Sequence, residues 1–300
     1  VREGGVIIYN SEDFQLEEDG KSFGMRIDEL AKSTGNPRAA NMVMLGAIAY
    51  LVHLPEHYLP EYVTKRFTRG RPGDEEIIKG NIMALTLGSE EAQKSGFSLG
   101  ELEDPTPPSG EQVLIKGNDA LAIGAIAAGL DVFIGYPISP ATTVLVYMER
   151  NLIGPGKFVY QASSEIESIN SIVGAGYAGK KAMTSTAGPG LSLMSEGIGM
   201  AWMAEIPCVV VDVQRGGPAT GLPTKVEQSD LLAAVHPAHG DVSIPVIAVG
   251  SVEECFTGAA LALNYAERYQ GPVILLSDHG LSEQAANIPT PSTCGSISPW

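Results

Sequence analysis

Short apolar runs alternate with longer helical stretches from residue 113 to about residue 285. Residues 132–135 and 208–213 have the length and composition of buried strands, and residues 252–269 have the length and period of a helix. We also expect strands at 158–161, 182–186, 244–249 and 272–277, and helices at 141–151, 166–178, 191–204 and from an N-cap at Asn118 or Asp119 through Leu130. Strands that alternate with helices predict an α/β fold with a doubly wound, mostly parallel sheet.

The first ninety residues have a pattern of their own. A strand is expected at 4–9 and helices at 27–32, 41–54 and 77–87, which predicts a smaller α/β domain. A linker follows, because residues 101–111 contain three prolines and four acidic residues and too little apolar surface to pack. We therefore divide the chain into a domain at 1–93, a linker at 94–111, the main domain at 112–285 and a polar tail at 286–300.

Composition argues against several classes of function. A net charge of −16 over 300 residues disfavours a nucleic-acid-binding surface, which needs a basic stripe. The one basic run, 65–71, is expected to be a solvated surface, and its role stays open. The three cysteines include no Cys-x-x-Cys pair, so we expect neither a zinc site nor an iron–sulfur cluster on this chain. The sequence has no run of eighteen apolar residues and no signal-peptide layout, which favours a cytoplasmic protein without membrane contact.

Four unusual loops follow the predicted strands, at 136–140, 162–167, 185–190 and 215–224. In an open α/β sheet such loops gather at the carboxyl ends of the strands, where ligands bind. In the first loop, Pro137 and Pro140 fix the backbone on both sides of Ser139 and hold its hydroxyl still, as a binding group requires. A simple turn is the alternative for this loop taken alone.

The second loop offers an acidic residue. Ser164 and Glu167 have the spacing of a capping box, which leaves Glu165 without a capping role. Glu165 either complements the dipole of the helix or lies at the edge of a site, where its carboxyl group hydrogen-bonds a heterocycle. On this motif alone the two interpretations have equal weight.

The last two loops are shaped by small residues. Residues 184–190 would let backbone N–H groups approach a ligand, although packing between crowded helices explains them equally well. Arg215 follows the most apolar strand, and its flanking glycines and prolines favour a carboxylate-binding role over that of a plain surface arginine. His236 and His239 are separated by Pro237, so we expect no metal site on this chain.

Together, four segments in this order resemble the α subunit of 2-oxoacid:ferredoxin oxidoreductases: Tyr136-Pro-Ile-Ser-Pro140, Ser164-Glu165, Thr184-Ser-Thr-Ala-Gly-Pro-Gly190 and Gln214-Arg-Gly-Gly-Pro-Ala-Thr-Gly-Leu-Pro-Thr224. Residues 112–285 resemble the pyrimidine-binding domain for thiamine diphosphate. Residues 1–93 resemble the carboxyl half of the family's γ component, fused ahead of α. This arrangement and the Arg215 loop resemble the 2-oxoglutarate branch more than the pyruvate branch.

The resemblance implies oxidative decarboxylation of a 2-oxoacid, with coenzyme A as co-substrate and ferredoxin as electron acceptor. Glu165 matches the glutamate that bonds the aminopyrimidine ring and helps to generate the reactive ylid. Arg215 matches the arginine that holds the substrate carboxylate, and Ser139 stands where the family commonly has threonine. The resemblance also assigns Tyr136 and Thr220 to substrate binding, and Pro137, Ile138, Ser185 and Gly188 to cofactor binding.

Half of the family's site is missing from this sequence. It contains neither a diphosphate/Mg²⁺ motif nor cluster cysteines, and the resemblance assigns Mg²⁺ and a [4Fe-4S] cluster to a β subunit. We therefore expect the chain to be inactive without a β subunit and to assemble as a dimer of αβ units. Pyruvate or a branched-chain 2-oxoacid is the alternative substrate. A non-catalytic assembly or binding subunit that keeps the fold is the alternative function.

Overall fold

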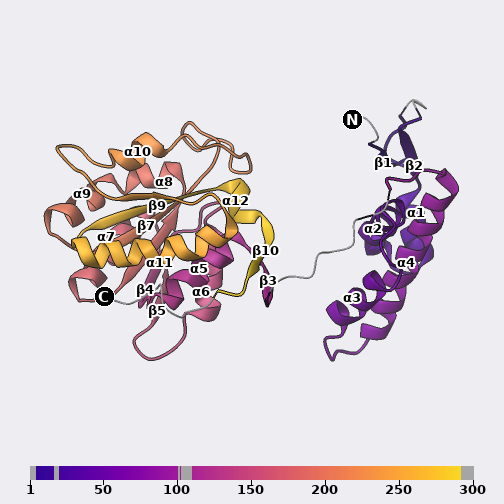
Figure 1. Ribbon diagram of the computed structural model, residues 1–300, viewed down its shortest axis with the longest axis horizontal. Helices are drawn as coiled ribbons and strands as arrows, with labels where there is room; N and C mark the ends of the chain where they lie inside the picture. The colour runs from indigo at the N-terminus through magenta and orange to yellow at the C-terminus, as the bar shows by residue number, and fades with distance from the viewer. Residues whose placement is uncertain (1–4, 17–19, 101, 103–109, 292–300) are drawn as a thin grey trace. The chain divides into compact units, whose positions relative to one another are not determined.

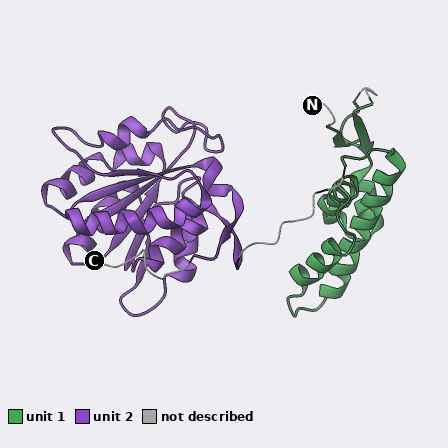
Figure 2. Ribbon diagram, viewed as in Figure 1, with its two compact units in different colours: residues 1–107 green, residues 108–300 purple. Residues whose placement is uncertain are grey.

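The computed structural model describes residues 5–16, 20–100, 102 and 110–291. The chain divides into two compact units, residues 1–107 and 108–300 (Figure 2). Most of the acidic, proline-rich part of the predicted linker lies outside the described residues.

The first unit is a small α/β unit dominated by helices. Its elements are β1 (Ile7–Asn10), β2 (Ser22–Met25), α1 (Ile27–Ser33), the 3₁₀ turn Pro37–Ala39, α2 (Ala40–Leu51), α3 (Tyr58–Phe67) and α4 (Asp74–Ser95). The strands pair in parallel, and α2 packs closely on α4 because Gly46 and Gly88 bring backbone against backbone. The sequence analysis did not predict α3, whose last turn contains Lys65 and Arg66 of the basic run.

The second unit is built on a six-stranded sheet in which every pairing is parallel. The strand order is β5-β4-β6-β7-β9-β8. These strands are β4 (Val132–Gly135), β5 (Phe158–Gln161), β6 (Ala182–Thr186), β7 (Cys208–Gln214), β8 (Val246–Ala248) and β9 (Pro272–Asp278). β4, β6, β7 and β9 are buried along their whole length, as expected for a parallel sheet covered on both faces. The predicted doubly wound parallel sheet is confirmed.

Helices cover both faces of this sheet (Figure 1). On one face lie α5 (Gly117–Ala127), α6 (Thr142–Asn151) and α11 (Val252–Tyr269), and on the other lie α7 (Glu165–Tyr177), α8 (Gly188–Leu193), α9 (Ser195–Met203) and α10 (Leu231–Val235). Side chains of β7 alternate between the two cores, with Val209 and Val211 in the first and Cys208 and Val210 in the second.

The strand order creates a switch point at β4. From β4 the chain passes through α6 to β5 on one side, and then through α7 to β6 on the other side of β4. Loops that leave β4 and β6 therefore diverge at the carboxyl edge, and a crevice outside such a switch point is where open α/β sheets bind ligands. Three of the four loops singled out in the sequence follow β4, β6 and β7.

A second, two-stranded antiparallel sheet joins the two ends of this unit. It pairs β3 (Gln112–Lys116) with β10 (Ala285–Pro289), and α12 (His279–Glu283) precedes β10. β10 thus occupies the start of the segment predicted as a polar tail at 286–300; residues 292–300 lie outside the described residues.

Two predictions about helices were wrong. α5 begins at Gly117 rather than after a cap at Asn118 or Asp119, and its N-cap, Lys116, makes no side-chain capping bond. The predicted helix at 191–204 is two helices, α8 and α9, separated at Met194. The first error has a clear cause: a Cβ atom at residue 117 would overlap the carbonyl oxygen of Leu281 in α12, so the glycine is fixed by packing.

The fold buries two of the cysteines. Cys208 and Cys255 are buried free thiols, and burial raises the pKa of each to about 12, which keeps them protonated at neutral pH. Cys294 lies outside the described residues. Among the described helices, none is long and apolar enough to cross a membrane.

Two glycines of α7 provide a matched test of this packing. A Cβ atom at residue 176 would overlap the carbonyl oxygen of Pro207 and lie 2.9 Å from Cγ2 of Ile206, whereas one at residue 174 meets nothing within 4 Å. We expect Gly176→Ala to lower the free energy of unfolding by about 1–3 kcal/mol through overpacking. Gly174→Ala should instead raise it by about 0.4–1 kcal/mol. Urea unfolding measures both, and equal effects of the two substitutions would contradict the packing.

Candidate functional site

Arg215 joins two of the loops at the carboxyl edge. It follows β7 directly and is only 5% exposed. Its Nη1 donates to the carbonyl oxygen of Ser139 over 2.6 Å, and its Nη2 donates to the carbonyl oxygen of Thr220 over 2.7 Å. Its Nε is buried and has no partner among the described residues. The guanidinium therefore holds both loops and keeps further N–H donors for a ligand.

The loop after β4 presents its side chains outward. Ser139 and Tyr136 are exposed, and Pro137 and Ile138 are partly buried. The carbonyl of Ser139 is occupied by Arg215, so the exposed hydroxyl is the group of this residue that can reach a ligand. The structure thus brings Ser139, Arg215 and Thr220 together through the backbone of two loops.

Glu165 lies at the start of α7 and is 6% exposed. Ser164 is the N-cap, and its Oγ accepts from the N–H of Glu167 over 3.1 Å. The carboxylate of Glu167 accepts from the N–H and the hydroxyl of Ser163, each over 2.6 Å. Ser164 therefore caps the helix as predicted, but the carboxylate of Glu167 accepts from the N–H of Ser163 instead of the N–H of Ser164. This arrangement leaves the carboxyl group of Glu165 for another role.

Gly190 fits against Glu165. A Cβ atom at residue 190 would overlap Oγ1 of Thr186 and lie 2.8 Å from Cγ and 3.0 Å from Oε1 of Glu165. Glycine is therefore required for the loop after β6 to approach the acid. Gly190 was part of the motif quoted from the sequence but had no role of its own there, and the Gly-Pro-Gly run at 188–190 was the available signal.

The two remaining cofactor candidates lie on opposite faces of the sheet. Ser185, only 3% exposed, donates its hydroxyl to the carbonyl oxygen of Ala141 over 3.3 Å, so it faces the loop after β4 rather than Glu165. Gly188 begins α8, and a Cβ atom there would lie 2.6–2.9 Å from the carboxyl group of Asp230. Gly188, Arg215, Thr220 and Asp230 line one cavity of about 610 Å³, to which neither Glu165 nor Ser139 contributes.

Asp212 is an acidic residue in the middle of the most apolar strand. It is fully buried, and both of its carboxyl oxygens lack a partner among the described residues. Burial raises the pKa of Asp212 well above its usual value, and the nearby carboxyl group of Asp230 raises it further. Burial also raises the pKa of Asp230, whose N–H donates to Oε1 of Gln214 over 3.0 Å. Sequence reasoning missed this pair because it treated 208–213 as a purely apolar run.

The raised pKa of Asp212 predicts the pH dependence of stability. A carboxyl group with a higher pKa in the folded state stabilises the fold below its unfolded pKa and loses that contribution as the pH rises through the folded pKa. Asp212→Asn removes the titration and should stabilise the protein at neutral pH by at least about 1 kcal/mol, because folding no longer has to protonate, or bury the charge of, a carboxyl group that is ionised in the unfolded chain. Thermal unfolding at pH 4 to 8 measures the difference, which should shrink toward pH 4. A gain that does not vary with pH would contradict a titrating Asp212.

Comparisons with known proteins identify the family of this chain. The family model for pyruvate flavodoxin/ferredoxin oxidoreductase, thiamine diphosphate-binding, matches residues 123–297, and that for pyruvate ferredoxin/flavodoxin oxidoreductase matches residues 1–91. The 2-oxoglutarate oxidoreductase subunit KorA of Mycobacterium tuberculosis is 39% identical over 84% of this chain and 39% of its own length. The 2-oxoglutarate synthase subunit KorA of Methanocaldococcus jannaschii is 48% identical over 55% of this chain and 45% of its own length.

A solved structure extends the match to both units. The 2-oxoglutarate:ferredoxin oxidoreductase from Magnetococcus marinus, with 2-oxoglutarate, coenzyme A and succinyl-CoA bound, is 41% identical, with a TM-score of 0.87 over 97% of this chain and 51% of that chain. The chain spans about half the length, or less, of the curated relatives it matches. The order of its motifs, its sheet and these matches together show that the chain belongs to the 2-oxoacid:ferredoxin oxidoreductase family, as an α-subunit sequence with its thiamine diphosphate-binding domain.

Proposed function

We propose that this chain supplies the pyrimidine-binding and substrate-binding half of the active site in a 2-oxoacid:ferredoxin oxidoreductase that converts 2-oxoglutarate to succinyl-CoA. The observation that carries the proposal is the buried Arg215, which joins the Ser139 and Thr220 loops beside the switch point of the sheet. The relatives named for 2-oxoglutarate, and the neighbour with 2-oxoglutarate and succinyl-CoA bound, favour this substrate over pyruvate or a branched-chain 2-oxoacid.

The residues around Glu165 fit the pyrimidine half of thiamine diphosphate. The close approach of Gly190 leaves a buried carboxyl group beside backbone at a helix start, with no side-chain Cβ in between. In this proposal Glu165 hydrogen-bonds the aminopyrimidine ring through its carboxyl group. Pro137, Ile138 and, through its bond to Ala141, Ser185 would shape the loop after β4, and Gly188 would shape the start of α8. Bound thiamine diphosphate supplies the carbanion chemistry of decarboxylation, and the protein supplies position and charge.

In this proposal Arg215 and Ser139 bind the substrate. The unused N–H donors of Arg215 would pair with a carboxylate of the 2-oxoacid, and a buried guanidinium binds such a group more strongly than an exposed one. The exposed hydroxyl of Ser139 would donate to the same carboxylate. Tyr136 and Thr220 would lie at the edge of this site.

The missing half of the site belongs to partners. We propose a β subunit that carries the Mg²⁺-diphosphate site and a [4Fe-4S] cluster, ferredoxin as electron acceptor, and assembly as a dimer of αβ units. The name of an α or KorA subunit in the relatives implies at least one partner chain. The domain boundaries at 93, 111 and 285, and a cytoplasmic location, stay predictions.

Coexpression tests the proposed function directly. The protein should copurify with a β-type chain that has diphosphate and cluster motifs, and the complex should reduce a viologen acceptor with 2-oxoglutarate and coenzyme A. Pyruvate and branched-chain 2-oxoacids are the comparison substrates. A purified complex that binds thiamine diphosphate but decarboxylates no 2-oxoacid would support the non-catalytic alternative instead.

Replacing Glu165 tests its role toward the cofactor. Glu165→Gln keeps the shape of the side chain but cannot hold or release a proton, so we expect turnover to fall by about 10²–10⁴-fold. Glu167→Gln is the matched control. Glu167 lies two residues after Glu165, and its carboxylate already accepts hydrogen bonds from Ser163, so this variant should keep near-normal turnover. Single-turnover decarboxylation measures both. Retained activity of Glu165→Gln would contradict the assignment.

Replacing Arg215 tests substrate binding. Arg215→Ala removes a charged donor, so kcat/KM for the 2-oxoacid should fall by roughly 10- to 100-fold. Because this change also releases two loop carbonyls, Arg215→Lys separates the effects: it keeps the charge but not the two-pronged geometry, and should be intermediate. Steady-state kinetics of the complex measures both variants. An unchanged KM and kcat in Arg215→Ala would rule out its role.

A further inference from the structure

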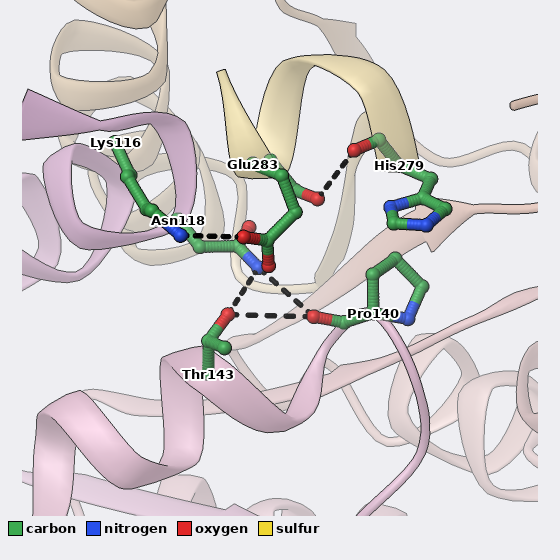
Figure 3. A network of polar contacts seen from close by, with 7 residues as sticks. Lys116, Asn118, Pro140, Thr143, His279 and Glu283 are labelled. Atoms are coloured by element: carbon green, nitrogen blue, oxygen red, sulfur yellow. Dashed lines mark hydrogen bonds and ion pairs between the residues drawn. The ribbon is translucent and has the colours of Figure 1, made fainter. Parts of the chain in front are cut away.

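Asn118 lies under the loop that carries Ser139. It is the second residue of α5 and only 1% exposed. Its Nδ2 donates to the carbonyl oxygen of Pro140 over 3.1 Å and to Oγ1 of Thr143 over 2.8 Å (Figure 3). Both N–H groups of this buried amide are thus used on one segment, at the end of the loop and the start of α6.

Two hydrogen bonds therefore fix neighbouring carbonyls of the loop from different elements. Arg215, after β7, binds the carbonyl of Ser139, and Asn118, in α5, binds the carbonyl of Pro140. Thr143 also approaches the Pro140 carbonyl, over 3.4 Å, but this exposed side chain makes a longer contact. With both carbonyls held, the backbone that carries the Ser139 hydroxyl has little freedom to turn.

The position of Asn118 depends in turn on α12. Gly117 lets the Leu281 carbonyl pack directly on the start of α5. The same helix is capped by Asp278, whose Oδ1 accepts from the N–H of Leu281 over 2.9 Å, while its Oδ2 accepts from Gln228 over 2.7 Å. Gln228 follows the Arg215 loop. The start of α12 thus supports both loops, one through Gly117 and Asn118, the other through Gln228.

We propose that Asn118 is a positioning residue for substrate binding, which sets the Ser139 hydroxyl relative to Arg215 by holding the Pro140 carbonyl. This rests on the proposed function, in which both groups bind one carboxylate. Asn118 touches no substrate itself, since it is buried beneath the loop. It acts on affinity for the 2-oxoacid rather than on the chemistry at the cofactor.

The test uses the complete complex with its β subunit and two substitutions. Asn118→Asp keeps the volume but replaces the donating amide by an oxygen facing the Pro140 carbonyl, and Asn118→Ala removes the group. We expect KM for 2-oxoglutarate to rise about 5- to 10-fold in both variants, with kcat reduced less than about twofold, the size of effect of one lost hydrogen bond. Steady-state viologen reduction gives both constants.

Asn264→Ala is the matched control. Asn264 is also a buried helical asparagine with an unpartnered Oδ1, but it lies in the second half of α11, toward the edge of the sheet where β9 begins. It should lower the melting temperature without changing KM. An Asn118→Asp variant with normal KM would overturn the positioning role while the proposed function stands. A wild-type complex without 2-oxoacid turnover would overturn both.

Discussion

The candidate site depends on the hydrogen bonds of one buried group, the guanidinium of Arg215. Taking a charged group out of water is costly unless its donors are used, and here two of them hold the carbonyls of Ser139 and Thr220. Those carbonyls belong to loops after different strands, so one side chain sets the distance between them. A carboxylate ligand would complete the same set of hydrogen bonds. In the proposed function, the arrangement of the loops and the affinity for a carboxylate therefore depend on the same group.

Close backbone contacts provide the rest of the precision. Gly190 lets the loop after β6 reach Glu165, and Gly117 lets α12 reach the start of α5. At both places a single methyl group would displace a neighbouring element. This explains why the site can be assembled from segments with so few charged side chains: it is built mainly from backbone held at short range by glycine, and the polar side chains Asn118 and Arg215 then fix the exposed loops.

Much of this could be predicted from the sequence, and the failures are informative. Periodicity gave the six strands of the parallel sheet and most helices, including α11 at its observed bounds, because a parallel sheet demands long buried runs, but it missed β2, β3 and β10. Loop convergence followed from topology, and it correctly brought Ser139 and Arg215 together. Contacts between distant segments could not be predicted. Leu281 packs on Gly117 although the two residues are 164 positions apart in the sequence, and nothing in the sequence near Gly117 indicates this contact. Asn118 was therefore predicted to be a helix cap. The sequence did contain a signal for Asp212, an acidic residue inside an apolar strand, and this signal was overlooked.

Asp212 also bears on how the site treats charge. In the proposed function, an ionised carboxylate at residue 212, inside β7 and three residues before Arg215, would weaken the positive potential that an anionic 2-oxoacid needs. Burial and the neighbouring Asp230 raise the pKa of Asp212, which favours its neutral form, so it offsets less of the Arg215 charge. The strand that precedes the arginine therefore carries an acidic side chain whose neutral form is favoured by its burial.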